Sequence, residues 1–155
     1  MEKLFDITEK IHFNLHKILT TTPEKQLFSI PENFNNNIFW NISHVLVTQQ
    51  LLVYKLSNHH TRIDWALVKK YSKGTFPENH VSMEEVQQVA EALLLTPKWT
   101  KEDYSNGLFK EYESYTTSAN VVLTNVKDAI AFNIFHLGLH IGTVQAIQKK
   151  LLASA

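Results

Sequence analysis

Two histidines in the last part of the sequence have the spacing of a metal-binding pair. His136 and His140 stand four residues apart in the segment FNIFHLGLHIGTVQAI. In a helix, residues four apart lie on the same face, about 6 Å apart along the axis, so both imidazoles can bind one ion. Neutral imidazole is a ligand for zinc, nickel, iron and other divalent metals. The spacing therefore predicts a metal site, provided that the helix turns this face inward.

A third histidine is predicted to face the same interior. The apolar stripe of the last helix, which includes Leu137 and Val144, places His140 near its centre and His136 at one edge. His44 lies in the middle of the apolar stripe of an earlier predicted helix. Three inward imidazoles from two helices could converge on one divalent ion and leave its fourth position open. Catalytic zinc sites use such an open position to acidify a water or a thiol.

The same histidines could also be satisfied separately, without a metal. A buried imidazole needs hydrogen-bond partners, because an unpartnered polar group costs roughly 1–3 kcal/mol. The periodicity leaves a shared site and separate residues as alternatives. His12 and His16 are also four apart, but they point roughly 100° and 140° from the stripe of the first helix. We expect these two at the flank of that helix or in solvent, and His59, His60 and His80 in solvated connectors.

Catalytic partners are harder to find near the three histidines. Thr48 and Asn133 each lie one helical turn from a proposed ligand, so either could orient a water at the metal or support a ligand by a hydrogen bond. Ordinary helix packing is the alternative role for both. No Asp or Glu lies within one turn of the histidines, and Asp128 projects about 140° away from Asn133. The sequence therefore predicts no general base of the protein's own.

Four amphipathic stretches predict the helices that would position these residues. Each has apolar residues at three- and four-residue spacings. Ser82 followed by Glu85 has the pattern of a capping box at the start of the third helix. Pro97 is expected to end that helix after about Leu95. The predicted helices cover about residues 2–20, 36 or 37–57, 82–95 and 125–152.

The remaining segments are predicted to be long connectors. Residues 21–37 contain two prolines and several asparagines without a regular pattern, and residues 58–81 are polar, with a short helical turn near Trp65. Residues 109–117 alternate aromatic and polar side chains, which fits a short strand or an extended loop. Four helices with one apolar stripe each are best buried against one another. We therefore predict an all-α, four-helix bundle with long connectors, as a single domain over residues 1–155.

The overall composition argues against several classes of partner. Fifteen Lys and Arg balance fifteen Asp and Glu, so no excess of positive charge is available to bind nucleic acid or anionic lipid. The chain has no cysteine, so a metal must use histidine or carboxylate ligands. The N-terminal residues lack the order of a secretory signal, and no long uninterrupted apolar stretch predicts a membrane span. We expect a cytoplasmic protein with a small-molecule substrate.

The arrangement of these motifs resembles the DinB/YfiT-like superfamily of four-helix metalloenzymes. The resemblance covers nearly the whole chain, including the opening helix, the run TTPEKQLFSIPENFNNNIFWNISHV and the closing FNIFHLGLHIGTVQAI. It implies a metal site formed by His44 of the second helix together with His136 and His140 of the last. Many members of the superfamily carry an acidic residue and a Gln where this sequence has Leu137 and Thr143. These departures affect groups near the metal rather than the ligands themselves.

The resemblance also implies what such a site could do. Characterised relatives are thiol-dependent transferases or isomerases that use low-molecular-weight thiols, and members frequently form homodimers. One hypothesis is a metal-dependent transferase or hydrolase that activates a thiol or water at zinc or nickel, with iron or manganese as further candidates. The alternative is a non-catalytic metal-binding, ligand-sensing or stress-response bundle, which the missing base favours. A substrate-sized cavity beside the metal would favour the enzyme.

Overall fold

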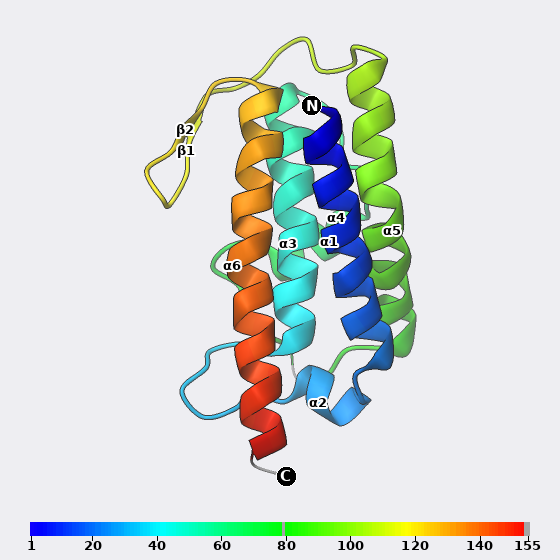
Figure 1. Cartoon of the computed structure of the whole chain (residues 1–155), viewed down its shortest axis with the longest axis vertical. Coiled ribbons are helices and arrows are strands. Elements are labelled where there is room, and N and C mark those ends of the chain that lie inside the picture. Colours follow the sequence, from blue (N-terminus) through cyan, green and yellow to red (C-terminus); the bar gives the residue numbers. More distant parts are fainter. Residues whose placement is uncertain (79, 154–155) are drawn as a thin grey trace.

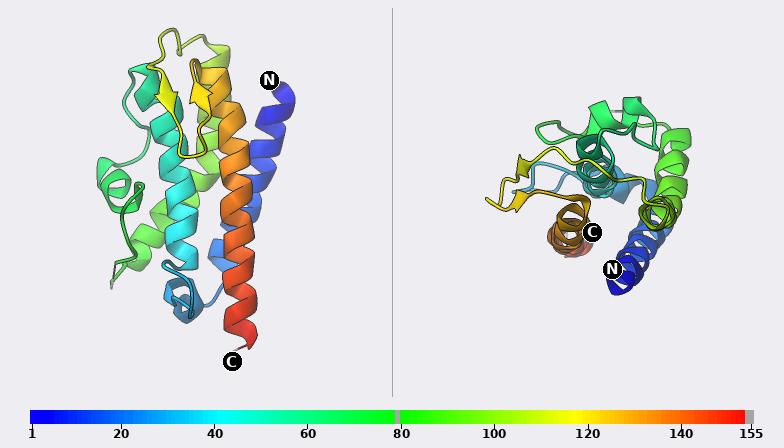
Figure 2. Two further views of the ribbon diagram at one scale, coloured as in Figure 1. Left: turned by 90° about the vertical axis from the view of Figure 1, so that its left-hand side faces the viewer. Right: turned by 90° about the horizontal axis from the view of Figure 1, so that it is seen from above.

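The computed structural model describes residues 1–78 and 80–153. Four long helices, α1, α3, α5 and α6, lie side by side along the long axis of the molecule (Figure 1 and Figure 2). α3 packs mainly against α6, and α1 packs mainly against α5. The elements of this part are α1 (Glu2–Thr21), α2 (Glu24–Phe28), α3 (Ile38–Val53), η1 (Lys55–Ser57), α4 (Trp65–Tyr71), α5 (Met83–Ser105), β1 (Tyr115–Thr116), β2 (Val122–Leu123) and α6 (Val126–Ala153). The predicted all-α class is confirmed.

α3 is the central helix of this arrangement. Fourteen of its sixteen residues are buried, as expected for a helix whose apolar residues cover almost its whole circumference. Its first turn is capped by Asn37, whose Oδ1 accepts a hydrogen bond from the backbone N–H of Trp40 at 2.8 Å. The sequence predicted that this helix begins at residue 36 or 37. His44 therefore projects from a helix that is almost entirely buried.

The two long connectors contain short helices that pack against α3. The first holds α2 directly after Pro23, whose fixed φ suits a helix start. The prediction of no regular element there is wrong, because the buried side chain of Leu27 anchors this turn in the core. The second connector holds α4 at the predicted helical turn. Asp64 caps α4 by accepting from the backbone N–H of Ala66 at 2.8 Å.

α5 continues through Pro97, where the sequence predicted its end. Proline has no amide hydrogen, so the carbonyl oxygen of Leu93, four residues earlier, cannot receive its usual helical bond. The Nδ1 of His12 in α1 lies 3.0 Å from that oxygen and supplies the missing hydrogen. The helix therefore continues to Ser105. His12 is buried, which corrects the expectation that it lies at the flank or in solvent.

The segment between α5 and α6 ends in a small hairpin. β1 and β2 are antiparallel, with Tyr115 opposite Leu123. Residues 109–117 were predicted as a strand or an extended loop, and only the two residues of β1 within them are in a strand. The tip of the hairpin contains Asn120 with a φ of 58°, a left-handed conformation that asparagine tolerates. In Figure 2 the hairpin lies over the side of α3 and α6.

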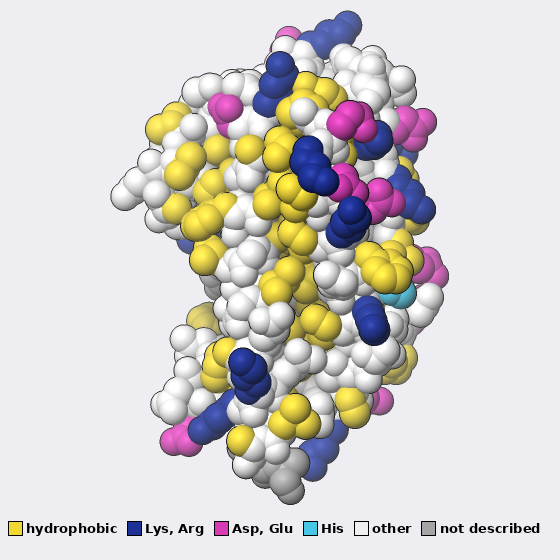
Figure 3. Space-filling view, viewed as in Figure 1, with side chains coloured by type: hydrophobic (Ala, Val, Ile, Leu, Met, Phe, Trp, Pro, Cys, Tyr) yellow, Lys and Arg dark blue, Asp and Glu magenta, His cyan; other side chains and the backbone are white. Residues whose placement is uncertain are grey.

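α6 carries the histidine pair and also an exposed apolar surface. In the described part of the chain it is the one helix long and apolar enough to cross a membrane, with a mean hydropathy of 1.3 and 28% of that window buried. Figure 3 shows apolar side chains along α6 and the hairpin, and Phe135 and Leu139 are about half exposed. α6 nevertheless packs along α3 in the bundle. The absence of a membrane span therefore stays a prediction.

Candidate metal centre

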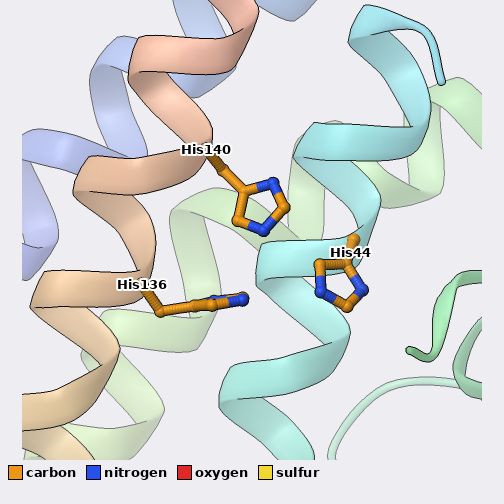
Figure 4. A group of neighbouring side chains, drawn as sticks. All are labelled: His44, His136 and His140. Atoms are coloured by element: carbon orange, nitrogen blue, oxygen red, sulfur yellow. The ribbon is translucent and has the colours of Figure 1, made fainter. Parts of the chain in front are cut away.

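The structure brings together the three histidines that the sequence singled out. His44 comes from α3, while His136 and His140 come from successive turns of α6, which runs antiparallel to α3 (Figure 4). One ring nitrogen from each residue lies within 4.8 Å of the other two. Nitrogens about 2.0–2.1 Å from one zinc ion lie roughly 3.4 Å apart in a tetrahedral site. The three rings are therefore close to the spacing of a metal-bound set.

His44 is held at one nitrogen and presents the other. Its Nδ1 lies 2.7 Å from the backbone carbonyl oxygen of Tyr71. A carbonyl oxygen only accepts, so Nδ1 carries the hydrogen and Nε2 keeps its lone pair. The ring also stacks on Trp40 at a centroid distance of 4.7 Å, and the Nε1 of Trp40 donates to Thr75. These contacts orient the imidazole independently of any ion.

His140 is oriented in a similar way by Asn41. The Nδ1 of His140 lies 2.8 Å from the Oδ1 of Asn41. The amide of Asn41 can point only one way, because its Nδ2 donates to the backbone oxygen of Asn37 and to the Oδ1 of Asn36. Asn41 therefore accepts from His140, and the Nε2 of His140 keeps a lone pair for a metal.

α4 supplies the carbonyl that orients His44, and two side chains hold α4 in place. The hydroxyl of Tyr71 donates to the carboxylate of Glu85 in α5. Lys70 pairs with the same carboxylate at 2.7 Å. Ser82 accepts from the backbone N–H of Glu85, which is half of the predicted capping box. The side chain of Glu85 does not complete the capping box, because it bonds Tyr71 and Lys70 of α4 instead.

His136 has an unpaired nitrogen. Its Nδ1 is buried and has no hydrogen-bond partner among the described residues. The ring lies nearly parallel to that of Phe132, with centroids 6.4 Å apart, and it points toward the space between His44 and His140 (Figure 4). A neutral imidazole carries a hydrogen on one nitrogen and a lone pair on the other, so a metal ion can bind this ring at one of its two nitrogens. Two oriented imidazoles and one unsatisfied imidazole form a donor set that fits a divalent ion.

Burial also keeps the three imidazoles in the form that binds metals. It lowers the pKa of His136 to about 4 and the pKa of His140 to about 3, and the neighbouring imidazoles act in the same direction. Burial lowers the pKa of His44 as well, against the hydrogen bond to Tyr71, which favours the protonated ring. Neutral rings offer lone pairs at pH 7 without first releasing a proton. The cluster could therefore hold a metal ion near neutral pH.

Thr48 and Asn133, the two residues proposed for supporting roles, lie in different surroundings. The Oγ1 of Thr48 is 3.4 Å from the Nε2 of His44, so Thr48 borders the metal position. Asn133 is buried and lines a small cavity with Gln49 and Thr100, on the side of α6 that faces α1 and α5. None of the three histidines lines that cavity. The structure brings Thr48 to the site but does not bring Asn133 there.

Two residues that support the site, Asn41 and Tyr71, were not found from the sequence. Asn41 precedes His44 by three residues and so shares its side of α3, which is a signal that helix periodicity contains. Tyr71 contributes a backbone oxygen, and every residue type has one. Only the docking of α4 brings this oxygen to His44.

A pocket of about 430 Å³ opens beside the three histidines. Sites for small molecules commonly measure roughly 300–1,000 Å³. Besides the histidines, its lining consists of apolar, hydroxyl and cationic side chains, without a carboxylate: Leu51, Leu52, Leu56, Phe132 and Leu139; Thr48, Tyr115, Thr117 and Ser118; Lys55 and Lys73. A hollow of about 520 Å³ near the start of α6 is larger but contains no histidine. The pocket beside the histidines is therefore the candidate substrate site.

The family of the chain follows from a sequence comparison. The model of the DinB superfamily matches residues 8–144, which include all three histidines and the helices that carry them. No curated protein sequence matches the chain. The match covers most of the length and agrees with the helical fold and the histidine cluster described above. This protein belongs to the DinB superfamily.

Proposed function

We propose that this protein is a divalent-metal-dependent enzyme that activates a thiol or a water for attack on a small substrate. A thiol-dependent transferase and a hydrolase are the two reaction classes that such a site can serve. The observation that carries the proposal is the pocket of about 430 Å³ that includes the three imidazoles in its wall. A closed structural metal site has no open position and needs no room for a second molecule.

The chain's own residues would hold and orient the ion. His44, His136 and His140 would bind it, while Tyr71 and Asn41 keep two of the rings in their binding orientation. A divalent ion held by neutral imidazoles lowers the pKa of a thiol or water that reaches it. Zinc and nickel are the first candidates because imidazole suits both, and iron and manganese are the alternatives.

The pocket suits a thiol better than water as the activated group. Among the described residues that line the pocket there is no carboxylate, so none of them is an Asp or Glu placed to take a proton from the attacking group. A thiol has an ordinary pKa of about 8.5, against about 15.7 for water, so it needs far less help to ionise. Thr48, beside the Nε2 of His44, is positioned to hydrogen-bond the incoming sulfur or oxygen. These points support a transferase ahead of a hydrolase.

A non-catalytic metal-binding or ligand-sensing bundle is the second candidate. The lack of a carboxylate in the pocket favours it. Leu137 favours it too, because this residue follows a proposed ligand directly and is buried in the core, where it offers no polar group. In this case a small molecule would occupy the pocket without being converted.

Elemental analysis tests the metal centre. The protein should be purified without a chelator or a metal-affinity column, and we expect one equivalent of zinc or nickel per chain. His44→Ala and His136→Ala should each lose most of that metal, because two imidazoles hold an ion far less tightly than three. His60→Ala is the matched control, since His60 is exposed and lies outside the cluster. Stoichiometric metal in His136→Ala would contradict the site.

Turnover distinguishes the two functions. We expect transfer of a small thiol such as 2-mercaptoethanol to a chromogenic electrophile such as 1-chloro-2,4-dinitrobenzene, followed by absorbance. The hydrolysis of p-nitrophenyl acetate tests the hydrolase in parallel. The rate should fall to the uncatalysed level in His136→Ala and with chelator, and it should return when metal is added back. An unchanged rate in His136→Ala would refute the enzyme, whereas bound metal without turnover would favour the sensor.

A further inference from the structure

The residues that line the pocket beside the three histidines follow one another along two helices. His44, Thr48 and Lys55 follow one another along α3 and η1, and all three line the pocket. The eleven residues from His44 to Lys55 correspond to roughly 16 Å of helical rise. On the opposite wall, α6 runs antiparallel, so His136 and then Phe132 follow in the same direction. The histidines therefore occupy one end of the pocket, and Lys55 lies at the other.

The wall between these ends is mostly apolar. Leucine and phenylalanine side chains from α3, η1 and α6 form it: Leu51, Leu52, Leu56 and Phe132. Leu139, between His136 and His140 in the sequence, extends the apolar lining at the histidine end. Leu139 is half exposed, so its side chain remains available for contact with a ligand. Burial of apolar ligand surface in such a wall contributes roughly 25 cal/mol per Å². The middle of the pocket therefore suits an apolar ligand body.

The charged side chains that line the pocket are cationic. Lys55 lies at the end far from the histidines. Lys73 comes two residues after Tyr71, the last residue of α4, whose carbonyl oxygen bonds His44. In the described part of the chain neither lysine has an ion-pair partner. The whole chain has no net charge, so this positive charge is a property of the pocket lining. On its other side Lys55 lines a neighbouring hollow with Glu111 and Glu113, neither of which lines the pocket. A cleft lined by one sign of charge concentrates ligands of the opposite sign.

We infer that the pocket accepts an elongated substrate with an apolar body and an anionic group, which Lys55 binds at the end far from the histidines. The anionic group can be a carboxylate, a sulfonate or a phosphate. Lys73 adds positive charge, and the hydroxyls of Tyr115, Thr117 and Ser118 on the hairpin are available as hydrogen-bond donors. The inference rests on the proposed function for the reaction at the histidine end, but binding of the anion needs no metal.

Calorimetric titration with three eight-carbon probes tests the inference. Octanoate, 1-octanol and octylammonium share an apolar body and differ in charge. We expect octanoate to bind more tightly than the other two, both in metal-loaded protein and in His136→Ala. Lys55→Gln should weaken octanoate about fivefold, as expected for a partly exposed ion pair, and leave 1-octanol unchanged. Lys69→Gln is the matched control, because Lys69 is exposed on α4 and does not line the pocket.

Each outcome separates this inference from the proposed function. Equal affinities for octanoate and octylammonium, or no effect of Lys55→Gln, would overturn the inference. A third result is possible: octanoate binding is lost in His136→Ala and unchanged in Lys55→Gln. It would place the carboxylate at the metal, which overturns the inference but leaves the proposed function intact. Lys55-dependent binding in a protein without metal-dependent turnover would uphold the inference and refute the proposed function. Added salt should weaken octanoate binding but not 1-octanol binding.

Discussion

The imidazole of His12 takes the hydrogen-bonding position that Pro97 leaves open in α5. Its Nδ1 lies 3.0 Å from the carbonyl oxygen of Leu93, the oxygen that the amide of residue 97 would bond in an uninterrupted helix. His12 is only 1% exposed, so this bond forms inside the core. A single contact thus lets α5 continue past a proline and joins α1 to α5.

The relationship predicts energetic coupling between His12 and Pro97. His12→Leu leaves the oxygen of Leu93 without a donor, at a cost of roughly 1–3 kcal/mol. Pro97→Ala restores an amide hydrogen that can bond the same oxygen, so it should recover about 1 kcal/mol in the His12→Leu background. Pro97→Ala in the wild-type background should not bring this gain in stability, because His12 already donates a hydrogen bond to the oxygen of Leu93. Urea unfolding of the four proteins measures the coupling, and strictly additive effects would contradict it.

The stability of the protein should also fall in mild acid because of His12. Burial lowers the pKa of His12 to about 4, against the effect of its bond to Leu93. The unfolded chain has a histidine pKa near 6.5, so it binds more protons than the folded state between these values. Stability therefore falls as pH falls, by about 2 kcal/mol from pH 7 to pH 5 for this residue. Urea unfolding with chelator present measures this effect. Between pH 7 and pH 5 the free energy of unfolding should fall by about 2 kcal/mol more in the wild type than in His12→Leu.

Asn41→Ala should weaken metal binding without removing a ligand. The substitution removes the oxygen that accepts from the Nδ1 of His140. Loss of such a supporting bond typically lowers metal affinity 10- to 100-fold. Competition with a chromophoric chelator gives the dissociation constant. Asn36→Ala is the control, since it removes a partner of Asn41 but leaves the acceptor of His140 in place. Equal affinities for the two variants would show that Asn41 does not orient His140.

Metal binding should persist in mildly acidic buffer. Burial holds the pKa of His136 at about 4 and the pKa of His140 at about 3, so protons compete with the ion only at lower pH. We expect the metal to be retained on dialysis at pH 5.5 and released as the pH approaches 4. Elemental analysis after dialysis measures the metal that remains bound at each pH. Release already near pH 6.5, the usual value for an exposed imidazole, would contradict the burial of the cluster.

Sequence spacing singled out the three histidines and placed them on two helices, but it left open whether they share one site. In an α-helix the spacing of two residues determines the angle between their side chains. The apolar residues around His44, His136 and His140 therefore indicate that their rings point inward. The observed α3 starts at Ile38, next to the predicted start at residue 36 or 37, and α6 lies within one residue of its predicted range at each end. The resemblance to the superfamily then implied a metal site at the same three residues, and the family match confirms the superfamily.

Spacing failed where a contact joins distant parts of the chain. Pro97 would end an isolated helix, but His12, 81 residues from Leu93, supplies the bond that the proline removes. The carbonyl of Tyr71 reaches His44 because α4 packs against α3 and the hydroxyl of Tyr71 bonds Glu85 of α5.

The pocket depends on the same kind of contact. Its walls come from α3, η1, α6, the hairpin and the loop after α4. The local sequence pattern of each segment does not predict how these segments pack against one another. Helix direction is a local property that residue spacing encodes, whereas hydrogen-bond partners, cavities and the surroundings of a charge arise from packing between distant segments. The candidate ligands could therefore be named from the sequence, whereas the groups that orient them and the pocket beside them were found only in the folded protein.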